Sequence, residues 1–145
     1  MKRLLLITTI FLATPPAFSK DILYLKCKVT ADMMTTDLTT SKVIEDRTID
    51  HISILKIDFK ASTAHDMYSP EAHDILIQGD RALIAQRIND DEVKFYDDGN
   101  LRLSSPYSLS GEGKVIYKSK NQKVNYSYQG RCIEVGASDF NDGLN

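Results

Sequence analysis

The 145-residue chain contains no tryptophan, only two cysteines and only three histidines. Neither cysteine has a second cysteine or a histidine at the spacing that zinc ligands need, which argues against a cysteine-ligated metal. Basic charge is not in excess either, because 18 lysines and arginines stand against 20 acidic residues and give a formal net charge of −2. A net-acidic chain without tryptophan is not typical of nucleic-acid binders, and we predict no nucleic-acid partner.

Long hydrophobic runs are also missing. The longest apolar stretch, Leu4 to Leu12, is about half of what spans a bilayer, and Pro15-Pro16 follows it closely. Two basic residues precede the stretch, and Ala17-Phe18-Ser19 fits a small-x-small cleavage site. This pattern predicts a signal peptide over residues 1–19 and export to the periplasm or the exterior. We expect no stable membrane insertion after cleavage.

Motifs for catalysis are absent as well. The sequence contains no Gly-x-Ser-x-Gly elbow, and Ser110-Gly111-Glu112-Gly113 lacks the third glycine of a phosphate-binding loop. His65 and His73 each stand in an Ala-His-Asp triplet, which makes them weak candidates for metal ligands, but no third ligand is evident. We therefore predict a protein that is not an enzyme and carries no cofactor.

The two cysteines, Cys27 and Cys132, lie in strand-like runs near the two ends of the exported chain. In an oxidising compartment such a pair predicts a disulfide. Because a disulfide requires its Cα atoms within about 7 Å, the first and last strands must lie side by side or face each other.

Short alternating segments predict an all-β domain over residues 20–135 with about eight antiparallel strands. We expect an up-and-down barrel closed by the disulfide, with a barrel-like sandwich as the alternative. Strands are expected at 21–30, 53–59, 74–78, 81–88, 93–96, 101–104, 114–119, 123–128 and 131–135. The polar residues 136–145 are expected to form a disordered tail.

Several stretches predict interruptions of this sheet. The Thr-rich residues 31–42 indicate a loop or a weak edge strand, and Asp97-Asp98-Gly99-Asn100 has strong turn chemistry. Residues 105–113, with Pro106 and two glycines, predict the longest loop of the second half. Gln129-Gly130 predicts a further turn, and Ser69-Pro70 the start of at most one helical turn.

Two resemblances rest on Tyr24-x-x-Cys27 in the first strand and Gly130-Arg131-Cys132 entering the last. The layout resembles small exported single-disulfide β proteins of unassigned function in cyanobacterial genomes. It is also similar to the C-type lysozyme inhibitors, which are small β-barrels. That second resemblance implies a Ser-Gly loop and a lysine that enter the lysozyme cleft. The matching positions here are Ser110-Gly111 and either Lys118 or Lys120.

Two functions follow as expectations. The first is a non-enzymatic binding protein that holds a small apolar ligand in its barrel or a protein partner at its rim. The second is an inhibitor of an exported hydrolase such as lysozyme, acting through the 105–120 region. For a partner-binding surface the candidate residues are Ser110, Tyr117, Lys118 and Lys120, because aromatic rings beside lysines form contact surfaces at low ordering cost.

Overall fold

A computed structural model describes residues 20–69 and 71–143 as eight strands and one short helix. The predicted signal peptide, residues 1–19, lies outside the described residues. The elements are β1 (Ile22–Asp37), β2 (Val43–Asp58), β3 (Thr63–Asp66), β4 (His73–Gln78), β5 (Arg81–Asn89), β6 (Val93–Arg102), β7 (Ser108–Tyr117), β8 (Gln122–Glu134) and α1 (Ala137–Gly143).

The strands form a closed antiparallel barrel in sequence order, as the alternation and the cysteines predicted. Closure comes from the pairing of the first strand with the last, which runs from Leu25 opposite Glu134 to Asp37 opposite Gln122. The disulfide joins Cys27 and Cys132, which are partners on one rung of that ladder with Cα atoms 4.0 Å apart. Hydrogen bonds therefore close the barrel, and the disulfide locks the register at which they do so.

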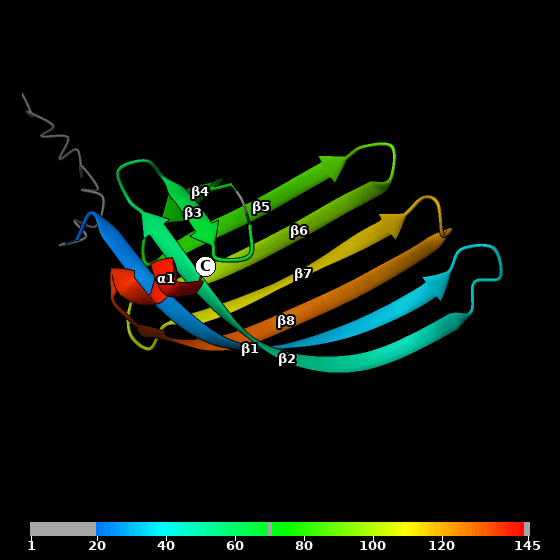
Figure 1. Cartoon of the computed structure of the whole chain (residues 1–145), viewed down its shortest axis with the longest axis horizontal. Helices are drawn as coiled ribbons and strands as arrows, with labels where there is room; N and C mark the ends of the chain where they lie inside the picture. The colour runs from blue at the N-terminus through cyan, green and yellow to red at the C-terminus, as the bar shows by residue number, and fades with distance from the viewer. Residues whose placement is uncertain (1–19, 70, 144–145) are drawn as a thin grey trace, which may run out of the picture.

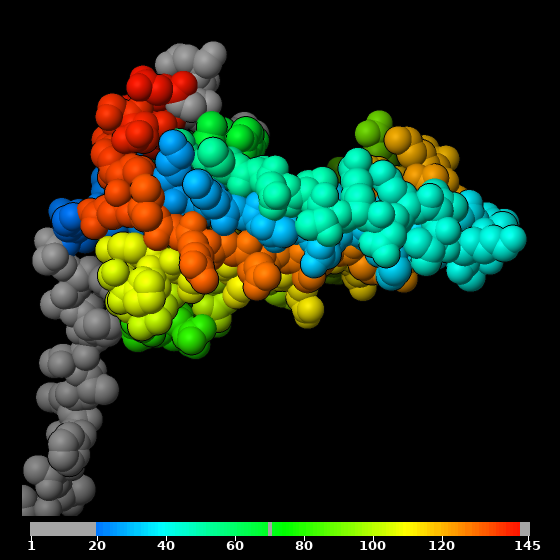
Figure 2. All heavy atoms as spheres, turned by 90° about the horizontal axis from the view of Figure 1, so that it is seen from below, coloured from blue at the N-terminus to red at the C-terminus, as the bar shows by residue number. Residues whose placement is uncertain are grey.

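The hydrophobic core fills the end of the barrel where β3, β4 and α1 lie (Figure 1). Alternate residues of each strand point inward, so that Leu25, Ile57 and Leu101 are completely buried there. From this end the hairpins β1–β2, β5–β6 and β7–β8 run together to the other end, and the tip of the β1–β2 hairpin projects beyond the body (Figure 2). The barrel is thus filled at one end only.

One side of the barrel is open toward the hairpin tips, because β3 and β4 are short. β2 pairs with β3 only over Leu55–Asp58, and β5 pairs with β4 only over residues 81–84. In the described part of the chain, residues 43–54 of β2 and 85–89 of β5 have no strand partner on that side. Apolar side chains at this edge are exposed, with Val43 at 54% and Ile44 at 52%.

Three predicted interruptions of the sheet are wrong, and for residues 31–42 the strand alternative holds over residues 31–37, which are paired on both sides and so do not form an edge. Residues 31–37 continue β1, residues 97–100 lie inside β6, residues 108–113 belong to β7, and residues 129–130 lie inside β8. Among the glycines that the structure describes, only Gly79 has a positive φ, 61°, and it forms the β4–β5 turn. The glycines within β6, β7 and β8 are extended, so they serve another purpose than turning the chain.

The predictions for residues 60–73 and for the C-terminal end also need correction. A strand, β3, was missed, and a turn at Met67-Tyr68 follows it in place of a helical turn, while Pro70 lies outside the described residues. The C-terminal residues 136–145, which were expected to be disordered, include the helix α1 over residues 137–143. Phe140 of this helix is only 3% exposed, because its ring packs against Tyr24 and His65 on the outer face of the barrel.

Candidate functional site

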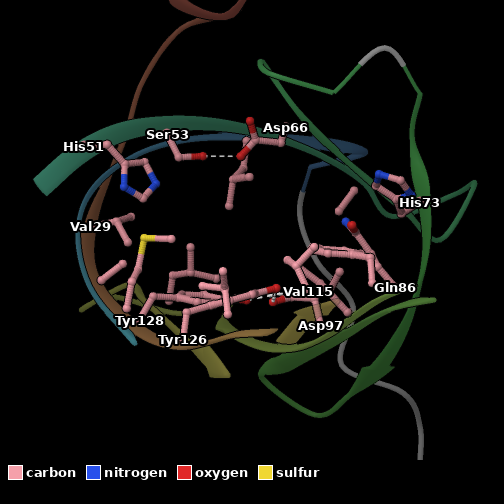
Figure 3. Close-up of a pocket in the computed structure, with 18 of the residues that line it drawn as sticks. Val29, His51, Ser53, Asp66, His73, Gln86, Asp97, Val115, Tyr126 and Tyr128 are labelled. Carbon is pink, nitrogen blue, oxygen red and sulfur yellow. Dashed lines mark hydrogen bonds between the residues drawn. The ribbon is translucent and has the colours of Figure 1, made fainter. Parts of the chain in front are cut away.

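A cavity of about 400 Å³ occupies the interior between the packed core and the open end (Figure 3). Its walls come from inward-facing positions of all eight strands. The apolar and aromatic lining residues are Val29, Ala31, Met33, Leu55, Ala64, Ile84, Phe95, Leu109, Val115, Tyr117, Val124, Tyr126 and Tyr128. The polar lining residues are His51, Ser53, Asp66, His73, Gln86 and Asp97.

The floor of the cavity is built by tyrosines that lie across glycines. Tyr128 pairs with Gly111 and Tyr126 with Gly113 on the neighbouring strand β7. Beyond these glycines, on β6, stand Gly99 and Asp97 in the same two rows. Because glycine has no side chain, each tyrosine ring can extend flat over β7 and bring its hydroxyl to β6. The glycines within the strands thus make room for the aromatic floor.

Asp97 accepts hydrogen bonds from both tyrosines. The Tyr126 hydroxyl donates to one carboxylate oxygen at 2.9 Å, and the Tyr128 hydroxyl donates to the other at 3.0 Å. Burial raises the pKa of Asp97, and the two hydroxyl donors oppose that rise. Burial and the neighbouring Asp97 raise the pKa of both tyrosines, which keeps their hydroxyls protonated as donors.

Three aromatic rings form a continuous row on this floor. The ring centroids of Phe95 and Tyr126 are 6.4 Å apart at an interplanar angle of 21°, and those of Tyr126 and Tyr128 are 6.2 Å apart at 22°. These spacings lie in the range where offset aromatic pairs attract. The row therefore presents a rigid aromatic surface to the cavity.

The facing wall carries a second carboxylate. Ser53 of β2 donates its hydroxyl to Asp66 of β3, and the backbone N–H of Tyr68 donates to the other oxygen of Asp66 at 2.8 Å. Figure 3 shows this pair beside His51, across the cavity from Tyr126, Tyr128 and Asp97. The cavity thus holds a carboxylate on each of two opposite walls.

The structure separates the two histidines that were weak metal candidates. His73 lines the cavity, whereas His65 lies on the outer face of β3 against the α1 helix. Each has a hydrogen-bond partner on Ser69, since the His65 Nε2 is 2.8 Å from the Ser69 carbonyl oxygen and the His73 Nε2 is 3.1 Å from its hydroxyl. Both histidines are thus held by Ser69, and within the described residues no group of three or more His, Cys, Asp or Glu side chains is placed to hold a metal ion.

Of the predicted partner-binding residues, Tyr117, Lys118 and Lys120 lie together at the β7–β8 turn, and Ser110 lies apart from them. Ser110 lies near the start of β7 and is exposed on its outer face, about 25 Å from Lys118, which follows the other end of the strand. Lys118 donates to the Asp90 carbonyl oxygen and links the β7–β8 turn to the β5–β6 turn. Lys120 lies 5.6 Å above the ring of Tyr117, which itself lines the cavity. The 105–120 segment thus consists of a short connection, the strand β7 and the start of the β7–β8 turn, and the inhibitory role stays a prediction.

Asp97, Tyr126 and Tyr128 were not among the predicted site residues. Asp97-Asp98-Gly99-Asn100 has the composition of a turn. A usable signal was present in the alternation, because Phe95, Asp97, Gly99 and Leu101 share one face. Glycines at alternate positions in β7 then match tyrosines at alternate positions in β8. That match depends on the strand register, which the sequence alone did not supply.

No protein-family model, curated protein or solved structure matches this chain. Within the described residues, no helix is long and apolar enough to cross a membrane. The functional assignment therefore rests on the chemistry of the cavity.

Replacing Asp97 by asparagine tests the electrostatics of the cavity floor. A carboxyl whose pKa is higher in the folded than in the unfolded chain stabilises the fold most below its unfolded pKa, and this contribution is lost as the pH rises through the folded pKa. We therefore expect the unfolding free energy of Asp97→Asn, relative to wild type, to increase between about pH 4 and about pH 7. Urea titrations across this range measure it.

The matched control is Asp98→Asn, which removes a charge from the exposed face of the same strand. It separates the effect of the buried position from the general effect of lowering the net charge. A difference between Asp97→Asn and wild type that does not change with pH, or that falls as the pH rises, contradicts the assignment.

Proposed function

We propose that the chain is an exported, non-enzymatic binding protein whose half-open barrel holds a small apolar ligand. The observation that carries the proposal is the cavity of about 400 Å³, which lies beside the unpaired edges of β2 and β5. Ligand sites are usually concave, largely apolar and supplied with a few fixed polar groups, and this cavity has that composition.

Two features support export. The residues 1–19 have the pattern of a signal peptide, and the Cys27–Cys132 disulfide suits an oxidising compartment. A cavity that side chains do not fill needs a rigid wall if it is not to collapse. The disulfide and the β1–β8 ladder provide one directly beside the cavity.

The polar groups of the cavity support binding. Both oxygens of Asp97 accept tyrosine hydroxyls, and both oxygens of Asp66 accept hydrogen bonds from Ser53 and Tyr68. These carboxylates hold the walls in place and present a fixed charge pattern to a ligand.

Filling the cavity should abolish ligand uptake. Ala31 lines the cavity beside Tyr128, its partner in the β1–β8 ladder. The side chain of Ala31→Phe would therefore occupy the space of the ligand. We expect this variant to bind the apolar fluorophore N-phenyl-1-naphthylamine at least tenfold more weakly than wild type does. Fluorescence titration of the oxidised protein measures the affinity.

The control is Thr30→Phe, which adds the same ring at the adjacent, exposed position of β1. It should bind the fluorophore as wild type does. Equal binding by wild type and Ala31→Phe, with both folded by circular dichroism, would show that the fluorophore sits elsewhere and would contradict the proposal.

A further inference from the structure

The charge of the cavity restricts the class of ligand. Asp66 and Asp97 line it from opposite walls, and no lysine or arginine is among the lining residues that the structure describes. The remaining titratable groups facing it are His51, His73 and three tyrosines. The lining thus contains two acids and no permanent cation.

Two permanent cations lie close to residues of the cavity without lining it. Lys120 lies 5.6 Å from the ring of Tyr117 at the open end, and Arg87 lies outside the barrel beside Asp97, where it is already engaged. Arg87 donates through Nη1 to the Asp97 carbonyl oxygen at 2.7 Å, and its Nη2 is 2.6 Å from Asp98 on the outer face. Its guanidinium is therefore hydrogen-bonded to Asp98 and to the backbone rather than to the Asp97 carboxylate, and its charge only partly opposes the effect of burial, which raises the pKa of Asp97. A carboxylate in an apolar cavity is costly unless a counter-charge accompanies it.

The aromatic row supplies the second feature. The faces of aromatic rings attract cations within about 6 Å, and aromatic sites in proteins use this attraction to bind ammonium groups. Phe95, Tyr126 and Tyr128 form such a surface directly beside Asp97. The carboxylates would repel an anionic amphiphile. A neutral amphiphile would not be repelled, but it would leave the carboxylates without a counter-charge.

We propose that the ligand of this cavity is an apolar ammonium compound, with its cationic group between Asp66 and Asp97 over the aromatic row and its hydrocarbon part along the apolar lining. This inference rests on the proposed function, because it names the class of ligand for the same cavity. The two carboxylates would make the cavity select cations over other ligands. The apolar walls would contribute affinity for any apolar ligand of suitable size.

Three probes with the same hydrocarbon chain separate these contributions: decyltrimethylammonium and decanoate, each below its micelle-forming concentration, and 1-decanol below its solubility limit. Displacement of N-phenyl-1-naphthylamine from the wild-type protein at neutral pH gives the three affinities. We expect the cation to bind at least tenfold more tightly than the alcohol and decanoate to bind most weakly. The alcohol measures the apolar cavity alone.

Two variants test the carboxylates. Asp97→Asn and Asp66→Asn should each reduce the ratio of the cation's affinity to decanol's affinity by about fivefold or more relative to wild type, because decanol binding in the same variant corrects for any change in the cavity walls. The Asp98→Asn control, on the outer face of β6, should keep the full preference. Retained decanol binding verifies that the cavity is intact, and if one variant fails to fold, the other decides the question.

The outcomes distinguish a failure of the inference about the ligand class from a failure of the proposed binding function. Equal binding of the cation and the alcohol, or a preference for the cation that survives in both variants, overturns the inference about the ligand class and leaves the apolar cavity standing. Failure of all three probes to bind overturns the binding function itself. A preference for decanoate would also overturn the inference, because the cavity would then select an anion in place of a cation.

Discussion

Replacing Cys27 and Cys132 together by alanine is expected to lower the unfolding free energy by about 4–5 kcal/mol. The disulfide spans 105 residues, and cross-linking so long a loop removes much of the conformational entropy of the unfolded chain. Since domains of this kind are stable by only about 5–15 kcal/mol, the double variant would lose a large fraction of its stability. Urea denaturation of the oxidised wild type and the double variant measures the difference.

Wild-type protein unfolded in the presence of a reductant provides the control, because it has the same sequence without the cross-link. Both should lose a similar amount. If the double variant is as stable as the oxidised wild type, the β1–β8 hydrogen bonds alone suffice to close the barrel, and the disulfide does not stabilise it.

Replacing Gly111 by alanine is expected to destabilise the protein by about 2–3 kcal/mol, although a glycine-to-alanine change at an unstrained position usually stabilises by about 0.4–1 kcal/mol. A Cβ at Gly111 would lie 2.7 Å from the Asp98 carbonyl oxygen and closer still to the ring of Tyr128. The ring cannot lift without breaking its hydrogen bond to Asp97. Thermal or urea denaturation measures the change.

Gly136→Ala is the matched control, because a Cβ there would meet neighbours only at 3.5 Å and beyond. This variant should be as stable as wild type or slightly more stable. If Gly111→Ala behaved in the same way, the tyrosines would not need the glycines, and the explanation of the cavity floor would be wrong.

The fold class was predictable because it depends on local alternation and on one long-range constraint. Alternating apolar residues in 21–30 and 53–59 identified strands whose inner faces are buried, and the cysteines placed the first strand beside the last. Those two facts suffice for a closed antiparallel sheet. The expectation of about eight strands is confirmed, although the nine expected segments divided β6 and β8 into two each and missed β3.

The cavity could not be predicted because it depends on register between strands. Gly111 and Gly113 have the composition of a loop until they are placed opposite Tyr128 and Tyr126, where they become sites of close approach. Asp97 likewise has turn chemistry in isolation and becomes the acceptor of two tyrosines in the barrel. Tertiary packing overrode the local preference of these residues for turns.

The most direct test of the binding function is native mass spectrometry of the oxidised protein, recovered from its exported compartment without refolding, beside Ala31→Phe prepared in the same way. We predict that wild type carries one small molecule, as isolated or after addition of decyltrimethylammonium, and that Ala31→Phe carries none. Wild-type protein that stays at its bare mass both as isolated and after addition of decyltrimethylammonium and 1-decanol would contradict the account.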